Sequence, residues 1–203
     1  MSEKNLQFCK PFYTIKSVKD EAQYRIDCKS IVLNLGEKDI IVKDKPLVSL
    51  QSTVVTNITI KNIQWALVVE NYEKNSEEEL LTAVKKQWPL MYEITHVDRY
   101  KRIPVRRSPK EKIENVELNL FYVGDQTSIG IHKEHDYREV HTQLLGFGKM
   151  QKFEENDYSK LYQEEILAPG FTHEPYCNKD GKYPWHQYQS ITESIYIYVN
   201  KYE

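Results

Sequence analysis

Most of the chain alternates short runs of β-branched and aromatic residues with polar turns. In the first half, five runs rich in Val, Ile, Thr and Tyr are separated by Gly, Asn, Asp and Lys: residues 24–28, 30–35, 39–42, 52–60 and 63–70. Such residues suit a half-buried pleated sheet, and the intervening residue types are typical of turns. The pattern predicts antiparallel β-structure.

One segment of the first half has helical spacing instead. Ser76 and Glu79 form a capping box at its start, and Pro89 follows its last turn. The apolar residues that fall on one helical face are Leu80, Leu81, Val84 and Trp88. We expect one helix over residues 76–88, packed on the outside of a sheet and without chemistry of its own.

The second half continues as short strands with turns at regular intervals. The runs cover residues 116–123, 128–132, 139–145, 149–154, 160–167, 172–176 and 191–200. Short strands at this spacing are typical of a sandwich or a barrel. A basic stretch with two prolines, residues 100–112, precedes them and is interpreted as a connector or a strand entering the barrel, with binding of an anionic substrate as an alternative. The chain is therefore divided into a β-rich N-terminal region, residues 1–112, and a C-terminal unit, residues 113–203.

Composition narrows the possible partners. The 203 residues carry 28 Lys and Arg against 30 Asp and Glu, a net charge of −2, which gives no basic surface for nucleic acid. No apolar run approaches the roughly 20 residues that span a bilayer, so no membrane partner is expected. The three cysteines are odd in number, the N-terminus is polar, and we expect a cytoplasmic protein with reduced thiols.

Histidine is concentrated in the C-terminal unit, where five of the six lie between residues 132 and 186. In a strand, alternate side chains share a face, so Glu139, His141 and Gln143 are expected to point the same way. His132 and His135 come just before this strand, and two imidazoles with a carboxylate form a ligand set for a borderline divalent metal.

A further histidine follows a tight turn. Pro169 and Gly170 precede His173, and in an antiparallel barrel this segment can lie near the Glu139 strand. His173 is therefore expected to reach the same pocket.

These two segments resemble the motifs of the cupin superfamily. His135-x3-Glu139-x6-Gly146 is similar to the first cupin motif, and Pro169-Gly170-x2-His173 is similar to the second. The resemblance implies an all-β fold, a cupin double-stranded β-helix or jelly-roll barrel, with one metal ion in its mouth. It implies His132, His135, Glu139 and His173 as ligands.

The match to the first motif departs at one position. Lys133 stands where the motif has its first histidine, so His141 is an alternative ligand to His132. The N-terminal region carries neither motif and is expected to be a structural or dimerisation extension, or else a degenerate second barrel. The resemblance also implies a homodimer.

A site of this kind implies two reaction types on a small, polar, oxygen-rich metabolite. With Fe²⁺, Zn²⁺, Mn²⁺ or Ni²⁺ bound, the protein would be an oxygenase or an isomerase or epimerase. His141 is the expected base and Gln143 the group that orients a substrate hydroxyl. Tyr137, Trp185 and His186 are expected to contact the substrate. The alternative function is a non-catalytic cupin module that binds or senses a small ligand.

Overall fold

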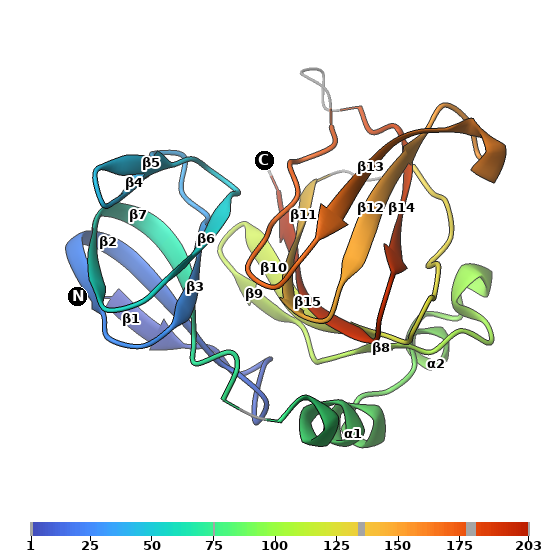
Figure 1. Ribbon diagram of the computed structural model, residues 1–203, viewed down its shortest axis with the longest axis horizontal. Helices are drawn as coiled ribbons and strands as arrows, with labels where there is room; N and C mark the ends of the chain where they lie inside the picture. The colour runs from blue at the N-terminus through green and yellow to red at the C-terminus, as the bar shows by residue number, and fades with distance from the viewer. Residues whose placement is uncertain (1, 75, 134–136, 178–181, 203) are drawn as a thin grey trace.

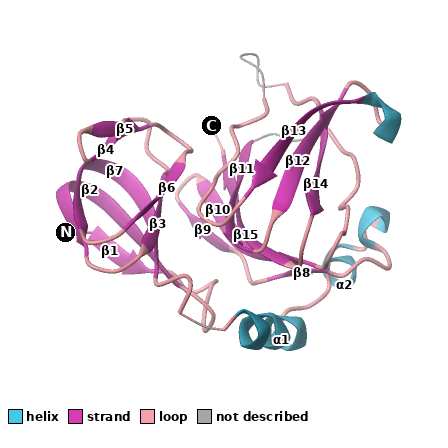
Figure 2. Ribbon diagram, in the orientation of Figure 1, coloured by secondary structure: helices cyan, strands magenta, loops and turns pink. Residues whose placement is uncertain are grey.

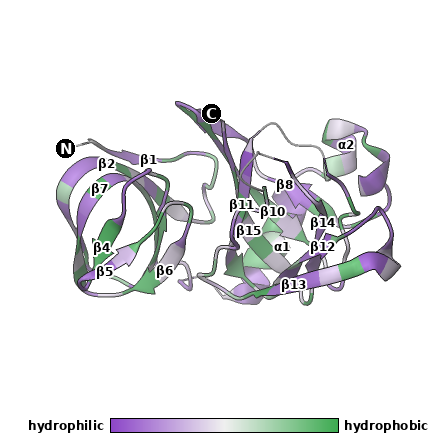
Figure 3. Ribbon diagram, turned by 90° about the horizontal axis from the view of Figure 1, so that it is seen from above, coloured by the Kyte–Doolittle hydropathy of each residue, from purple (hydrophilic) through white to green (hydrophobic). Residues whose placement is uncertain are grey.

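The computed structural model describes residues 2–74, 76–133, 137–177 and 182–202 and consists mainly of antiparallel sheets (Figures 1 and 2). The first half forms one seven-stranded sheet in the order β1-β2-β7-β3-β6, with β4 pairing β5 and β7. Its strands are β1 (Ser2–Asn5), β2 (Thr14–Ile26), β3 (Ser30–Asn34), β4 (Ile40–Val42), β5 (Lys45–Leu47), β6 (Ser52–Val55) and β7 (Ile58–Glu70). The sheet curls strongly, as Figure 3 shows from above. The prediction of β-structure is confirmed here.

The boundary between two predicted strands lies at a different residue in the structure. The runs 52–60 and 63–70 were expected to be separate strands, but β7 runs unbroken from Ile58 to Glu70. Asn57 and Asn62 both have left-handed φ angles, of 51° and 60°. The chain turns at Asn57, whereas Asn62 is accommodated within β7 as an irregular position that the pairing with β2 skips. Asparagine tolerates this conformation in either setting, so the residue type alone does not separate a turn from an irregular strand.

The predicted helix is confirmed, and a second short helix follows it. In α1 (Glu77–Gln87) the Ser76 hydroxyl accepts the Glu79 N–H at 3.3 Å, and one apolar face is buried. The prediction of one helix missed α2 (Met91–Thr95), which begins where the Glu93 carboxylate accepts the Leu90 N–H at 3.2 Å. A single turn of this length has too few residues to show helical periodicity.

The second half forms two facing sheets. One has the order β11-β15-β10-β8, with β9 also paired to β10, and the other has the order β13-β12-β14. The strands are β8 (Val105–Arg107), β9 (Glu111–Ile113), β10 (Val116–Val123), β11 (Arg138–Leu145), β12 (Gly148–Phe153), β13 (Leu161–Leu167), β14 (Trp185–Ser190) and β15 (Ser194–Lys201). Isolated bridges extend both sheets, at Thr142–Thr172 in the first and at Ser128–Gln189 and His132–His186 in the second. This two-sheet arrangement confirms the predicted jelly-roll fold.

The edges of this unit differ in detail from the prediction. The predicted closing strand, residues 191–200, is β15, which begins at Ser194 after a turn at residues 191–193, and β14 before that turn is an additional strand. Its first residues, Trp185 and His186, are those that the sequence predicts to contact the substrate. The expected boundary between residues 112 and 113 falls inside β9, and the basic stretch supplies β8 and β9 to the sheet of β10.

The two halves share one hydrophobic core. Alternation along β3 and β7 places Leu33 and Leu67 in a cluster with Leu118 and Ile197 of the second half. The intervening residues, such as Val68, line a separate core inside the curled first sheet. The sheet of β10, β15 and β11 is therefore buried on both faces: one face lies against the N-terminal sheet and the other lines the jelly roll.

A chain of hydroxyl groups also joins the halves. Thr172 Oγ1 donates to Ser52 Oγ of β6 at 2.6 Å, and Ser52 Oγ donates to the Gly170 carbonyl at 2.8 Å. Thr142 Oγ1 of β11 lies 2.6 Å from Thr172 Oγ1 on the other side. The turn that carries His173 is thus held between β6 and β11.

No helix among the described residues is long and apolar enough to cross a membrane.

Gly170 is the residue at which this contact is closest. Its φ is +91°, and an added Cβ would lie 2.2 Å from Val54 Cγ2. We expect Gly170→Ala to lower the free energy of unfolding by about 1–3 kcal/mol, because it adds both a clash and backbone strain. Urea unfolding measures the change.

The double variant Gly170→Ala/Val54→Ala is the control for the clash. It removes the methyl group that the new Cβ would meet and leaves only the strained φ, so it should recover part of the loss after the cost of Val54→Ala alone is subtracted. Equal stability of Gly170→Ala and the native protein would contradict the close approach of the two halves.

Candidate metal centre

Strand β11 carries three polar side chains into the jelly roll, as strand alternation predicted. Glu139, His141 and Gln143 are 2%, 1% and 0% exposed, whereas their neighbours Val140 and Leu144 pack into the core shared with the first sheet. Burying a carboxylate is costly without partners, so the surroundings of Glu139 decide what the site can do.

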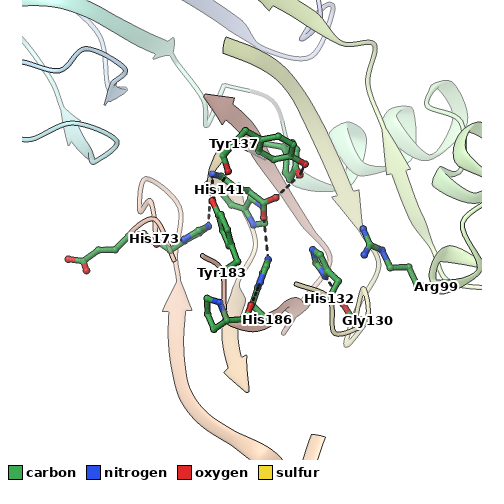
Figure 4. A network of polar contacts seen from close by, with 12 residues as sticks. Arg99, Gly130, His132, Tyr137, His141, His173, Tyr183 and His186 are labelled. Carbon is green, nitrogen blue, oxygen red and sulfur yellow. Dashed lines mark hydrogen bonds and ion pairs between the residues drawn. The ribbon is translucent and has the colours of Figure 1, made fainter. Parts of the chain in front are cut away.

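Two histidines of the facing sheet lie opposite Glu139. His132 and His186 are bridge partners, and their rings lie 4.5 Å apart between centroids (Figure 4). His132 Nδ1 lies 3.0 Å from the Gly130 carbonyl, and His186 Nδ1 lies 2.9 Å from the Pro184 carbonyl. A carbonyl can only accept a hydrogen bond, so both Nδ1 atoms must carry the proton. In its neutral form each ring then presents an unprotonated Nε2, as a metal-bound histidine does.

A tyrosine pair holds the carboxylate from the other side. Tyr198 of β15 donates its hydroxyl to Glu139 Oε2 at 2.6 Å, and the Tyr137 hydroxyl lies 3.1 Å from that of Tyr198. The Glu139 N–H donates to Tyr183 Oη at 2.7 Å, and Tyr183 donates to the Tyr137 carbonyl. Burial, and next the charge of Glu139, raise the pKa of Tyr198 well above its usual value, so this hydroxyl keeps its proton.

His132, Glu139 and His186 form a group suited to a metal ion. One ligand atom from each lies within 4.8 Å of the others. Metal bonds of about 2.0–2.2 Å to nitrogen and oxygen would bring such atoms to within about 3–4 Å of one another, so only a small contraction is needed. The donor set, the tautomers and the support for Glu139 all fit a borderline divalent ion.

Electrostatics keep His132 neutral. Burial, with added repulsion from Arg99 and His186, lowers the pKa of His132 to about 3. A neutral imidazole at physiological pH is the form that binds a metal.

His141 lies next to this group but is held differently. Its Nε2 is 3.0 Å from Glu139 Oε1, although the contact lacks the angles of a hydrogen bond, and neither ring nitrogen has a hydrogen-bond partner among the described residues. The ring stacks on Tyr196 at 4.6 Å between centroids. A buried imidazole of this kind is available for a ligand or a proton, so the two roles expected for His141 both stay open.

The structure places His173 outside the metal-binding group. Its Nε2 accepts the His141 backbone N–H at 2.9 Å, and its Nδ1 lies 2.8 Å from the Glu174 carbonyl. Both ring nitrogens are therefore occupied by the backbone, which leaves no ligand atom. In place of the expected His173, the geometry brings in His186, which was expected to contact substrate.

The other expected site residues have different surroundings. The Gln143 amide donates to the Leu145 carbonyl and accepts the Tyr188 hydroxyl, so protein groups occupy both of its ends. Trp185 alternates with His186 along β14 and so lies on the opposite face of the strand. Tyr137 lies next to the centre, where it supports Tyr198. His135 lies outside the described residues and stays a sequence-based prediction.

Tyr198 is the residue that should be tested first as a support for Glu139. We expect Tyr198→Phe to weaken metal binding about 10–100-fold, because Glu139 loses the hydrogen bond that fixes its outer oxygen. Competition with a chromophoric chelator measures the affinity. Tyr137→Phe is the matched control, since its hydroxyl contacts Tyr198 and not Glu139, and its effect should be smaller. Equal affinities of all three proteins would show that the tyrosine pair does not position Glu139.

The burial of His173 predicts a dependence of stability on pH. Burial, and next the neighbouring His141, lower the pKa of His173 from 6.5 to about 3. Below the higher value the unfolded chain binds a proton that the folded chain does not, so stability is lost as the pH falls from 6.5 towards 3. For this residue the expected slope is about 1.4 kcal/mol per pH unit.

Urea unfolding of chelator-treated protein between pH 7 and pH 5 measures this slope. His173→Gln should unfold with a pH slope smaller by that amount, since the remaining groups titrate in both proteins. An unchanged slope would mean that His173 is not buried in the neutral form.

Comparisons with known proteins give matches only among solved structures. No family model matches the sequence, and no curated protein matches it. The chain is similar to a cupin superfamily protein from Desulfitobacterium hafniense DCB-2, at 14% identity over 49% of this chain and 78% of that chain, with a TM-score of 0.38. It is similar to KdgF from Halomonas sp., at 11% identity over 49% and 79%, with a TM-score of 0.37. A cupin 2 conserved barrel domain protein from Leptotrichia buccalis matches 96% of this chain and 85% of its own, at 10% identity and a TM-score of 0.38. The solved structures similar to this chain thus include cupins, the superfamily that its two motifs resemble.

Proposed function

We propose that this chain is a metal-dependent enzyme that acts on a small, oxygen-rich metabolite, with the metal held by His132, Glu139 and His186. The observation that carries the proposal is the pair of imidazoles whose Nδ1 protons are fixed by backbone carbonyls on the side away from a buried carboxylate. In their neutral form these two rings would offer unprotonated nitrogens to a metal ion beside one carboxylate, as metal-bound histidines do.

A divalent Fe, Zn, Mn or Ni ion bound there would polarise substrate oxygens as a Lewis acid or, in the case of iron, support oxidation by O2. Three protein ligands leave positions open for substrate and water. His135, expected from the sequence motif, would add a further ligand and narrow this space.

The chain's own groups would orient the substrate and move a proton. His141 is buried, its ring is fixed against Tyr196, and its Nε2 lies beside Glu139 Oε1. This places an imidazole next to the oxygens of a substrate bound at the centre, where it would act as general base. The facing rings of Tyr196 and Tyr198 exclude bulk water from the proton that His141 would take.

Metal content tests the ligand assignment. We expect purified, metal-reconstituted protein to hold about one divalent ion per chain by plasma mass spectrometry, and we expect Glu139→Gln and His186→Ala to lose most of it. His173→Ala is the control and should keep the ion, because the backbone occupies both of its ring nitrogens. Loss of metal in His173→Ala with retention in His186→Ala would overturn the assignment.

Turnover separates the enzyme from a binding module. The metal-loaded protein would be assayed with a panel of hydroxy acids, keto acids and sugars for O2 uptake and for solvent deuterium exchange by NMR. We expect one of these activities, and we expect His141→Gln to reduce it about 10²–10⁴-fold while metal content is unchanged. Tight binding of one compound without either reaction would favour the sensing module instead.

A further inference from the structure

An exposed arginine, Arg99, lies beside His132 of the metal-binding group. Arg99 belongs to the short 3-10 turn Asp98–Tyr100, and its side chain lies against Gly130, where an added Cβ would be 3.4 Å from Arg99 Cβ. Gly130 is also the residue whose carbonyl holds His132. In Figure 4 the guanidinium lies to one side of His132, whose pKa its charge lowers. Within the described ranges, no carboxylate lies at ion-pair distance from it.

The guanidinium is held in place from one side. It donates to Tyr100 Oη at 3.0 Å, and its central carbon lies 4.9 Å from the centroid of the same ring. Tyr100 is itself buried in the core of the jelly roll. The contact with Tyr100 uses an N–H of Nη2. No described residue accepts the other N–H groups of the guanidinium, so they are available to a ligand. A guanidinium is suited to a planar carboxylate, which it can bind through two parallel hydrogen bonds.

A second cation lies next to His186 in the same sheet. Lys152 of β12 pairs with His186 and shares its inward face, and its Nζ lies 4.1 Å above the ring of Tyr176. That ring packs 4.7 Å from His173, and its hydroxyl donates to Glu165 at 3.3 Å. Lys152 thus lies near the Glu165 carboxylate, whose pKa is raised by burial and lowered in part by the Tyr176 hydrogen bond and then by the Lys152 charge.

The charges around the centre favour an anion. Among the described residues, Arg99 and Lys152 offset the charges of Glu139 and Glu165 before a divalent ion adds its two positive charges. Glu139 is buried, whereas Lys152 is half-buried and Arg99 is exposed, so a carboxylate ligand at the edge of the buried group would meet both the ion and the guanidinium.

We propose that the substrate of this centre is a carboxylate, received by the Arg99 guanidinium while its neighbouring oxygens reach His132, Glu139 and His186. This inference rests on the proposed function, since it concerns the ligand of the same centre. Lys152, the neighbour of His186 in its sheet, adds a second, weaker attraction. The substrate class is therefore narrowed from oxygen-rich metabolites in general to oxygen-bearing acids, such as hydroxy or keto acids.

The test uses Co²⁺-loaded full-length protein and two probes, lactate and its neutral counterpart lactamide. Both offer a hydroxyl and a carbonyl oxygen, and they differ in charge. Each probe is titrated while the visible absorption of Co²⁺ is followed. We expect Arg99→Gln to weaken lactate binding at least about tenfold, which corresponds to about 1.4 kcal/mol. Lactamide binding should change less than about twofold.

Three further variants sharpen the result. Arg99→Lys keeps the charge and loses the planar fork, so its lactate affinity should fall between those of the native protein and Arg99→Gln. Lys152→Met should weaken lactate less than Arg99→Gln does. Arg25→Gln removes an exposed charge in the first sheet, whose partners among the described residues are Asp27 and Asn57, and should leave both affinities unchanged.

Two outcomes would overturn the inference, and they are distinguishable. If Co²⁺ binds and Arg99→Gln takes up lactate as tightly as the native protein, the carboxylate inference fails and the metal centre stands. If the native protein takes up no Co²⁺, the proposed function fails, and the inference fails with it.

Discussion

The C-terminal half depends on holding one carboxylate, Glu139, between two packed sheets. Its side chain is 3% exposed, so water cannot stabilise its charge, and the protein must supply the partners. The Tyr198 hydroxyl binds one oxygen, and the rings of His141 and His186 face the other at 3.0 and 4.0 Å. A divalent ion would offset this charge, and the backbone carbonyls that accept from Nδ1 of His132 and His186 leave the Nε2 of each neutral ring for it.

The rest of the fold keeps these groups in register. Glu139 and His141 are on β11, Tyr198 is on β15, and the pairing of β11 with β15 places His141 directly beside Tyr198. The N-terminal sheet packs against the outer face of these strands through Leu33, Leu67 and their neighbours. The first half of the chain therefore contributes to the centre without a ligand of its own, by burying the back of the sheet that carries it. The contact of Ser52 with Thr172 extends this support to the turn before His173.

Local sequence predicted the parts of the centre that lie on one strand. Strand alternation brought Glu139 and His141 to one face, and the run of polar residues on an inward face indicated chemistry. It could not choose between His173 and His186, because that choice depends on which segment pairs with residues 128–132, a contact made across more than fifty residues of chain. The motif favoured His173, whereas in the fold the backbone occupies both nitrogens of that ring.

The sequence alone predicted less about the tyrosines that support Glu139. Fifteen tyrosines are spread along the chain, and only the register of β11 with β15 distinguishes Tyr198 from the others. Arg99 lies just before the basic stretch, residues 100–112, and was not among the expected site residues. It lies next to Gly130 because α2 and the turn after it fold the chain back toward that residue, and the helical pattern did not predict α2.

Anomalous diffraction from a crystal of the zinc-loaded protein, recorded on both sides of the zinc absorption edge, tests the central claim most directly. The account predicts one strong peak per chain within bonding distance of His132, Glu139 and His186, with the Tyr198 hydroxyl still on the outer oxygen of Glu139. A peak bound by His173 instead of His186, or no peak at Glu139, would contradict it.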